Sequence, residues 1–483
     1  MKRHSNTEII SILLHVAVLL FTMTGCSDIA SDIVPEITAE SGNPPVPTEI
    51  IDTVDPEVEQ IVNPDRSLFD GESITVAVNF ENLMQPFAAA YMRDNPGVTI
   101  EVVSYDEYWN RGNMHMAREE IATQLMAGSG PALMLGSLVN YLDPRSHNNF
   151  SDWLPIMRAD PDFNEDDWFM NAFDAVSVKG RLLAFPTDFY YDIVTANRTI
   201  PGLPEVLSAK QSITFSELVD AHRSISLDAQ YLFEPRNSFR ATITMHYLHN
   251  FLDFETGMVD FDNERFIDLI ANIRGIMDPD KQTFISNVVS PEEEAAISEE
   301  YSFIFSGFMD FQYFLDFDEA LFIEPTPVVN DDGELMMYPL HSYLLNANAT
   351  PTQQALAWDF IKFTMQPESY PPVLTQIGWQ PTNKNLLRHI FENNLPFNID
   401  YWFTKEFGWQ LNGTMEDAVE GAIAMATSIG DMPMFNNTIL PDEVSSMITE
   451  KLRDYQDGLL SAEQTAQNLQ NQVELVLMEI SAS

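Results

Sequence analysis

The sequence predicts an α/β fold with at least two lobes. A β-rich run at residues 73–78 is followed by apolar residues at helical spacing and by a second β-rich run at residues 98–103. This strand, helix and strand occupy about 30 residues, the size of a βαβ unit with parallel strands. Hydrophobic residues make up 45% of the chain, enough for a large core. Because 483 residues exceed a domain of roughly 100–200 residues, we expect more than one lobe.

Further elements follow in chain order. Residues 118–127 have the pattern of a helix that ends at the glycines and proline of residues 128–131, and residues 132–135 predict a third strand. Near the C-terminus, Ser461 and Gln464 have the spacing of a capping box, which satisfies free backbone donors at a helix start. The apolar residues after it predict a helix packed on a core: Ala466, Leu469, Val473, Val476 and Ile480.

The first residues have the pattern of an export signal. Lys2 and Arg3 precede an apolar run over residues 9–23, shorter than the ~20 apolar residues of a membrane-spanning helix. The run ends at Met23-Thr24-Gly25-Cys26, which resembles the lipobox of bacterial lipoproteins, although leucine is commoner in place of Met23. The resemblance implies a signal peptide over residues 1–25 and a lipidated, palmitate-bearing Cys26. A plain signal peptide and an uncleaved anchor with an incidental cysteine are the alternatives.

Cys26 is the only cysteine of the chain. Once it is acylated, no thiol remains for a disulfide or a cysteine metal site, so the core must support the fold. Residues 26–71 are rich in proline, acidic residues, serine and threonine and have no sustained apolar period. They predict a flexible acidic tether, with a short helix near residues 58–62 as the alternative. No later segment has enough apolar length to cross a bilayer, so we expect a soluble body.

The charge of the chain is strongly negative. The sequence has 73 acidic and 24 basic residues, for a formal net charge of −49. Such a surface repels phosphate backbones, which argues against nucleic acid as a partner. Because carboxylates are so frequent, two neighbouring acidic residues give little reason to infer a catalytic pair. The negative charge is also what keeps many exported proteins soluble.

Several short motifs lie in a fixed order along the chain. They are Asn95-Pro96-Gly97-Val98, residues 125–131, Asp152-Trp153-Leu154-Pro155, residues 179–186, 213–218, 255–262, 357–363, 378–383 and 457–466. Together these motifs resemble the bacterial extracellular solute-binding proteins of the maltose-binding type (family 1), over nearly all of residues 72–480. Two positions depart from the pattern: Ala132, where many members have aspartate, and Ala196, where a tyrosine usually precedes Asn197.

The resemblance implies a two-lobed, periplasmic-binding-protein-like fold of type II. Each lobe would be a mixed sheet flanked by helices, and hinge crossings would join the lobes around a bound solute. Lobe I would contain residues 72–188 and 341–375, and lobe II residues 189–340 and 376–483. The chain would cross near residues 186–191, 339–343 and 376–378.

Ligand-contacting side chains are expected at the crossings and in the loops that follow strands. Sugars need aromatic faces and planar polar groups, and Asp188, Tyr190 and Tyr191 at the first crossing supply both. Alternate side chains of that strand must nevertheless face the core. The other candidates are Asn79, Glu81, Trp109, Ser137, Tyr141, Phe308 and Trp379. Trp153, Trp168 and Trp358 are expected to pack in the core.

Signals of catalysis or metal binding are weak. The sequence has no Gly-x-Ser-x-Gly, no phosphate-binding glycine loop and no His-Glu-x-x-His. His246 and His249 could share a metal, but no third ligand is evident, and a packed helix is the preferred interpretation. Residues 330–334 lack the spacing of a calcium loop and predict an acidic turn. We therefore expect no catalytic residue, no metal and no cofactor.

The sequence thus predicts a monomeric, lipid-anchored, extracytoplasmic solute-binding protein and not an enzyme. It would capture a carbohydrate by lobe closure and deliver it to the permease subunits of an ABC importer. The alternatives are a secreted carbohydrate-active enzyme and a binding protein that reports to a sensor kinase.

Overall fold

The computed structural model of the chain describes residues 69–482 except 142, 226–230, 234–242, 254–255, 275–300, 308–314, 319, 370–379, 407, 437–439 and 441. All of them belong to one compact unit, residues 61–483. The predicted signal peptide, Cys26 and the tether as far as residue 68 lie outside the described residues.

The first sheet has five strands in the order β2-β1-β3-β13-β4. Strands β1 (Ser73–Val78), β2 (Thr99–Ser104) and β3 (Leu133–Leu135) run parallel to one another. Strand β13 (Ser342–Leu345) lies antiparallel between β3 and β4 (Ala184–Pro186). The three strands predicted between residues 73 and 135 are therefore confirmed, including the parallel βαβ unit.

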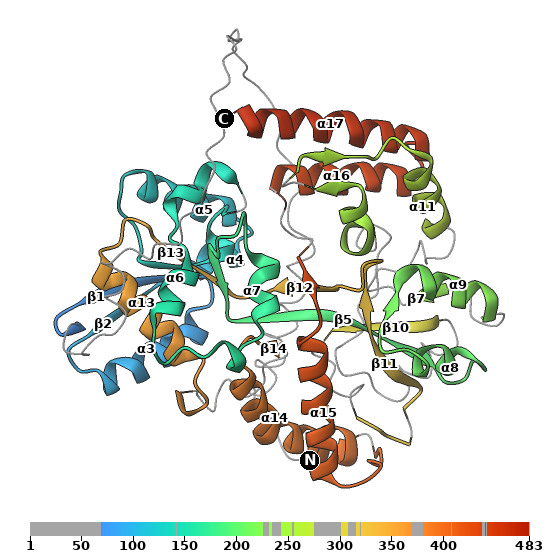
Figure 1. Cartoon of the computed structure of the whole chain (residues 1–483), viewed down its shortest axis with the longest axis horizontal. Helices are drawn as coiled ribbons and strands as arrows, with labels where there is room; N and C mark the ends of the chain where they lie inside the picture. Colours follow the sequence, from blue (N-terminus) through green and yellow to red (C-terminus); the bar gives the residue numbers. More distant parts are fainter. Residues whose placement is uncertain are drawn as a thin grey trace, which may run out of the picture. The chain divides into compact units, whose positions relative to one another are not determined.

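Helices surround this sheet (Figure 1). They include α3 (Glu81–Asp94), α4 (Asp106–Asn110), α5 (Met114–Met126), α6 (Trp153–Ala159), α7 (Met170–Val176) and α13 (Pro351–Thr364). Trp153, Trp168 and Trp358 are 0%, 6% and 2% exposed, so their predicted packing role is confirmed. Asp160 joins α6 to α13, because its carboxylate accepts from the Trp358 indole at 2.8 Å and from Lys362 at 2.6 Å.

The second sheet has eight strands and is organised around β5 (Asp188–Asn197). Strands β10 (Tyr301–Gly307) and β11 (Phe322–Val329) lie antiparallel on its two sides. The first half of β5 also pairs with β12 (Leu335–Pro339) and β14 (Gln380–Pro381). The remaining strands are β6 (Ile213–Thr214), β7 (Tyr231–Phe233) and β15 (Met434–Phe435).

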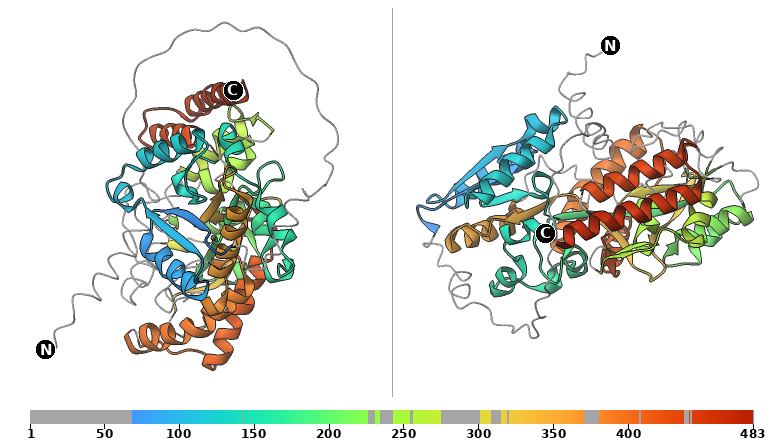
Figure 2. Two further views of the ribbon diagram at one scale, coloured as in Figure 1. Left: turned by 90° about the vertical axis from the view of Figure 1, so that its left-hand side faces the viewer. Right: turned by 90° about the horizontal axis from the view of Figure 1, so that it is seen from above.

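Helices around the second sheet share one core cluster with it. They are α8 (Leu203–Ser208), α9 (Phe215–Ile225), α11 (Glu264–Arg274), α16 (Asp442–Gln456) and α17 (Ala462–Ala482). Figure 2 shows α16 and α17 side by side. The predicted capping box is confirmed, since Ser461 and Gln464 exchange hydrogen bonds of 2.9 and 3.2 Å. Four residues of the predicted stripe on α17 are buried, and the side chain of Ile480 lies outside the described residues.

A further group of helices follows β14. It comprises α14 (Lys384–Asn398), the π-helical segment η10 (Ile399–Glu406) and α15 (Met415–Gly430). A small hairpin of β8 (Leu252–Asp253) and β9 (Met258–Val259) lies apart from both large sheets. Among the helices that the structure describes, none combines the length and the apolar character needed to cross a membrane.

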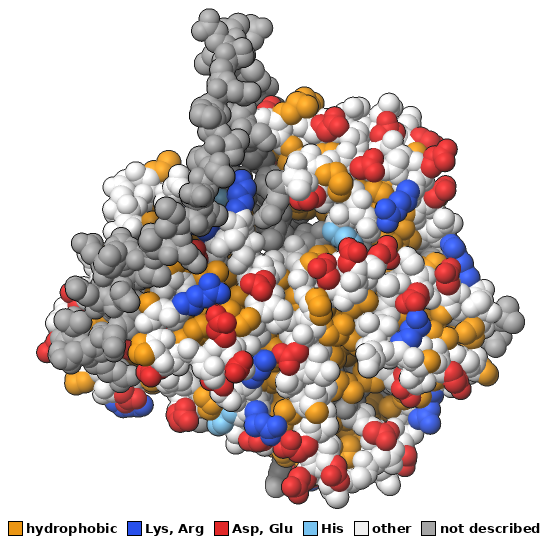
Figure 3. Space-filling view, viewed as in Figure 1, with side chains coloured by type: hydrophobic (Ala, Val, Ile, Leu, Met, Phe, Trp, Pro, Cys, Tyr) orange, Lys and Arg blue, Asp and Glu red, His pale blue; other side chains and the backbone are white. Residues whose placement is uncertain are grey.

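Acidic side chains are spread over the face shown in Figure 3 and are not gathered in one patch. This distribution follows from the large excess of aspartate and glutamate over lysine and arginine. A negative charge dispersed over this face favours its solvation.

Two short segments carry the chain between the sheets. The first is Thr187, between β4 and β5, and the second is Leu340 and His341, between β12 and β13. The chain leaves the first sheet after β4 and enters the second sheet as β5 (Figure 1). The third predicted crossing, at residues 376–378, lies outside the described residues, but β14 directly after it pairs with the start of β5.

Candidate functional site

One edge of the first sheet brings together loops from distant parts of the chain. The parallel strands β1, β2 and β3 all end there, and the antiparallel β13 begins there. In open α/β sheets, the loops after the carboxyl ends of strands form the ligand site. We call the side chains that meet at this edge the edge cluster: Asn79, Phe80, Trp109, Ser137, His341 and Ser342.

Asn79 and Ser137 form the polar part of the edge cluster. Asn79 is 1% exposed, and its Oδ1 accepts from the Ser137 hydroxyl at 3.3 Å. The Arg118 guanidinium donates to the Ser137 carbonyl at 3.0 Å, which fixes this loop. Within the described residues, Asn79 Nδ2 and Ser342 Oγ are buried without a hydrogen-bond partner. Because buried polar atoms are nearly always paired, these two mark unused hydrogen-bonding capacity at the edge.

Phe80, Trp109 and His341 form the aromatic part. The Phe80 ring lies edge-on to Trp109 with centroids 5.4 Å apart, and edge-on to His341 at 6.2 Å. Trp109 is half-buried, so part of its ring faces solvent. Glu81 opens α3 with an exposed side chain, and its backbone N–H donates to Asp106 at 3.4 Å. The predicted residues Asn79, Glu81, Trp109 and Ser137 therefore lie at one edge.

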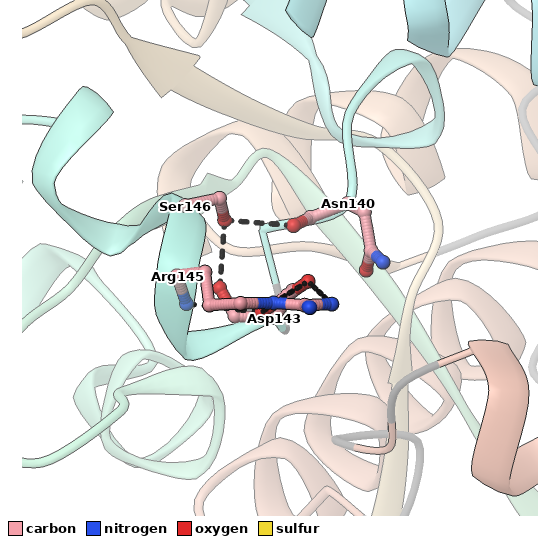
Figure 4. Close-up of polar contacts among 4 residues, drawn as sticks. All are labelled: Asn140, Asp143, Arg145 and Ser146. Carbon is pink, nitrogen blue, oxygen red and sulfur yellow. Dashed lines mark hydrogen bonds and ion pairs between the residues drawn. The ribbon is translucent and has the colours of Figure 1, made fainter. Parts of the chain in front are cut away.

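Tyr141 lies in the loop that follows β3, and polar contacts brace this loop (Figure 4). Arg145 pairs with Asp143 at 2.6 Å, while the Ser146 hydroxyl donates to the Asn140 and Asp143 carbonyls at 2.7 and 2.8 Å. Tyr141 is half-buried, and burial raises the pKa of its phenol to about 12. Its ring approaches Gly136, where a Cβ would lie 3.5 Å from the ring and 3.3 Å from the Ser342 carbonyl. A side chain at position 136 would therefore crowd the start of β13, which glycine avoids.

Asp188 joins the two crossing segments. It is 8% exposed, and its carboxylate accepts from the His341 backbone N–H at 3.1 Å and lies 2.8 Å from His341 Nδ1. Thr382, directly after β14, joins the same place, because it donates to the carbonyls of Pro186 and Thr187. Both carboxylate oxygens of Asp188, a predicted solute contact, are therefore engaged by His341 within the protein.

The next residues of β5 alternate between two faces, as strand geometry requires. Tyr190 is half-buried, and its ring stacks on Tyr338 with centroids 4.4 Å apart and planes 15° apart. Asp192 follows on the same face, and burial raises the pKa of its carboxyl to about 7. Burial and the nearby Asp192 also raise the pKa of Tyr190. This face of β5 presents an aromatic pair next to a weakly acidic carboxyl.

Tyr191 points to the opposite face. It is 0% exposed, and its hydroxyl donates to Gln380 Oε1 at 2.9 Å. Gln380 in turn donates to the Ala426 carbonyl at 3.3 Å, which links β5 to α15. In this structure Tyr191 is an interior residue. The candidates Trp379 and Phe308 lie outside the described residues.

Sequence reasoning did not select several residues of this region. Phe80 stands directly between two selected residues, and His341 lies within the predicted second crossing. Asp192 follows Tyr190 on the same face of β5, a relation that the strand period of two could have indicated. Ser342 also lies within that predicted crossing, whereas Tyr338 carries no local signal, because its place here comes from pairing with the distant strand β5.

Two segments were considered as weak candidates for metal binding: the pair His246 and His249, and residues 330–334. The described side chains of both segments make structural contacts. The His249 ring packs against Phe435 with centroids 4.9 Å apart, and the side chain of His246 lies outside the described residues. Asn330 accepts from the backbone N–H groups of Asp332 and Glu334, so the predicted acidic turn is confirmed. Within the described part of the chain, no three side chains of His, Cys, Asp or Glu lie together as metal ligands would.

Comparison with known proteins gives matches to solved structures. The sugar-binding protein MalE of Xanthomonas citri aligns with a TM-score of 0.58 and 14% identity, over 85% of this chain and 98% of MalE. A periplasmic oligogalacturonide-binding protein of Yersinia enterocolitica aligns with a TM-score of 0.55 and 12% identity, over 85% and 100%. The cyclic alpha-maltosyl-1,6-maltose-binding protein of Arthrobacter globiformis aligns with a TM-score of 0.53 and 14% identity, over 84% and 99%.

The chain has the two-lobed α/β fold of these binding proteins. The fold inferred from the sequence motifs is thereby confirmed. No protein-family model matches the sequence, and no curated protein matches it either. The likeness is therefore one of fold, preserved over nearly the whole length of the solved proteins while the sequences differ at most positions.

Proposed function

We propose that this protein is an extracytoplasmic solute-binding protein that captures a carbohydrate between its lobes and delivers it to an ABC importer. The observation that carries the proposal is the fold shared with three proteins that each bind a sugar. The edge cluster supports the same function. It combines aromatic rings, which suit the C–H faces of sugars, with amide and hydroxyl groups, which suit their hydroxyls.

In this proposal, lobe I consists of residues 72–188 and 341–375, and lobe II of residues 189–340 and 376–483. Closure of the lobes would bury the solute without a covalent step. The proposed solute contacts are Asn79, Glu81, Trp109, Ser137, Tyr141 and Tyr190, together with Trp379 and Phe308, which lie outside the described residues. Asp188 would act through the crossings. Tyr191 would support β5 from its interior face.

A thermal-shift screen tests the function. The full chain, purified in detergent, is heated with maltose, oligogalacturonides or xylo-oligosaccharides. Free ligand at about 100 times its Kd stabilises the folded state by about 2.7 kcal/mol, which gives a clear rise in Tm. We expect such a rise with one saccharide class, its loss in Trp109→Ala and its retention in Phe397→Ala. Phe397 is a suitable control because it is an exposed aromatic residue of α14.

Other outcomes separate the alternatives. Chromatography that shows breakdown of the stabilising sugar would favour a carbohydrate-active enzyme. A rise in Tm without stimulation of any importer ATPase would favour a protein that reports to a sensor kinase. The absence of a shift with every saccharide would contradict carbohydrate binding.

We also propose that residues 1–25 are removed during export and that Cys26 carries the lipid. Labelled palmitate should be incorporated by the full chain in a bacterial host and lost in Cys26→Ser, while Ser27→Ala keeps the label. The Cys26→Ser protein should move from the membrane fraction to the soluble fraction, because a single change removes the anchor. Equal labelling of both variants would contradict the lipid anchor.

A further inference from the structure

His341 joins the two crossing segments through hydrogen bonds in both directions. Asp188 accepts from the His341 backbone N–H at 3.1 Å and lies 2.8 Å from the His341 ring nitrogen Nδ1. In return, the backbone N–H and the hydroxyl of Thr187 donate to the His341 carbonyl at 2.8 and 3.0 Å. The segment before β5 and the segment before β13 therefore meet at one residue.

Asp188 determines which nitrogen of the imidazole holds a proton. A carboxylate accepts hydrogen bonds and cannot donate them, so Nδ1 carries hydrogen in both charge states of the ring. Titration then takes place at Nε2. When the ring is protonated, it neutralises the Asp188 charge in a place where the two side chains are only 15% and 11% exposed. When the ring is neutral, the carboxylate keeps an uncompensated charge there, which is unfavourable in a buried site.

The electrostatics at this junction agree with the geometry. Burial alone would lower the pKa of His341, but the charge and hydrogen bond of Asp188 outweigh it and raise that pKa above its ordinary value. Burial and the Asp188 charge also raise the pKa of Tyr343. The titratable groups on the strands that meet at the junction are Asp188, Tyr190, Tyr191 and Asp192 of β5, Tyr338 of β12 and Tyr343 of β13. Helix α3, which follows Phe80, begins with Glu81, whose backbone N–H donates to Asp106 of α4.

The same ring contacts the edge cluster. Phe80 lies edge-on to His341 at 6.2 Å and to Trp109 at 5.4 Å, and it directly follows Asn79. A shift of the His341 ring would therefore move Phe80. Phe80 would in turn shift Trp109, which it contacts, and Asn79, to which it is bonded in the chain.

We propose that His341 is a positioning residue that makes solute affinity depend on pH, by holding the crossing segments and Phe80 in the arrangement that binds solute. This inference rests on the proposed function. Protonated His341 forms a charge-neutral pair with Asp188 and holds the crossings most firmly, so the solute binds most tightly below the pKa of His341. Above that pKa, Asp188 keeps its hydrogen bonds from His341, but its charge is no longer neutralised, so the junction weakens and affinity falls.

The first test needs no solute. The full chain is labelled at the histidine rings, and NMR follows their titration from about pH 5 to about pH 9, around the ordinary histidine value of about 6.5. The His341 signal is assigned by its loss in His341→Asn. We expect His341 to titrate above the ordinary value and to fall by about one unit or more in Asp188→Asn. An ordinary value in the wild type, or an unchanged value in Asp188→Asn, would overturn the proposal.

The second test measures affinity by calorimetry with maltose and with any saccharide that raised the Tm. The wild type should bind about fivefold or more weakly above the pKa of His341 than below it, within the usual range of coupling between sites. His341→Asn keeps a donor toward Asp188 but cannot titrate, so the fivefold change in affinity that titration of His341 causes should be absent from this variant. The control His389→Asn, on α14, should behave as the wild type.

The two tests fail in different ways. If His341→Asn keeps the pH dependence of the wild type, His341 is not its source and the proposal is wrong. If no saccharide binds at any pH, the proposed function fails and the coupling to solute fails with it, whereas the NMR titration still reports on the His341–Asp188 pair. Circular dichroism checks that each variant folds, and His341→Asn decides the binding test even if Asp188→Asn does not fold.

Discussion

Burial shifts the pKa of single side chains in the second sheet, and each shift has a consequence for stability. Asp192 has a folded-state pKa of about 7, because burial disfavours its charged form. The pKa of an aspartate in an unfolded chain is about 3.9, so between these values the folded state binds the proton more tightly. The free energy of unfolding therefore falls as the pH rises through this window.

We predict that Asp192→Asn stabilises the protein at about pH 8 and has little effect at about pH 4, since the amide resembles the neutral carboxyl and cannot ionise. Denaturant unfolding of the wild type and the variant at both pH values measures the difference. An equal difference at the two pH values would show that ionisation of Asp192 is not its cause.

His222, on α9, makes the free energy of unfolding depend on pH in the opposite direction. Its Nδ1 lies 2.9 Å from the Ser302 hydroxyl, the side chain is 7% exposed, and burial lowers its pKa to about 4. An unfolded histidine has a pKa of about 6.5, so between about pH 6.5 and about pH 4 only the unfolded state binds the proton. The free energy of unfolding therefore falls as the medium is acidified.

We predict that His222→Asn, which can keep a hydrogen bond to Ser302, loses less stability on acidification than the wild type, by roughly 3 kcal/mol at the most. Denaturant midpoints measured between about pH 4 and about pH 7 check this. Parallel curves for the two proteins would contradict it. The control His389→Asn should follow the wild-type curve.

At the scale of elements, α17 contributes to the core around the second sheet through one apolar face. Leu469 is 0% exposed in the core cluster, whereas Leu475 on the same helix is 60% exposed. We predict that Leu469→Ala lowers the free energy of unfolding by about 2–5 kcal/mol, the range for deletion of a buried leucine side chain. The matched variant Leu475→Ala should change it by no more than about 0.5 kcal/mol. Urea unfolding measures both, and equal effects would refute the assigned orientation of the helix.

The sequence predicted the elements better than it predicted their contacts. The run at residues 73–78, the helix cap at Ser461 and the core tryptophans depend on local pattern and composition, which a sequence displays directly. Asn79 and Ser137 were found because loops after parallel strands meet at one edge of a sheet. The pairing of Asp188 with His341 joins residues 153 positions apart, and no local pattern specifies it. Adjacent residues of a strand point to opposite faces, so only one of Tyr190 and Tyr191 can point to the interior. The alternation itself does not specify which of the two it is.

At the scale of the whole molecule, charge has a measurable effect. The formal net charge is −49, and dispersed like charges repel one another in a compact state. We predict that Tm rises when the NaCl concentration is raised from about 10 mM to about 150 mM, because the Debye length falls from about 30 Å to about 8 Å. KCl should have the same effect at equal ionic strength. A Tm that does not change with salt would show that repulsion is not significant.

The order of strands in the first sheet also governs how the chain is made. Strand β13 is central in that sheet, between β3 and β4, yet it begins at Ser342, long after β3 ends at Leu135. A ribosome must therefore synthesise most of the chain before this sheet can close. Contacts between such distant segments form slowly, since a long loop must be ordered first. A nascent chain of this topology therefore cannot complete its first sheet until β13 has been synthesised, whatever the order in which its other elements form.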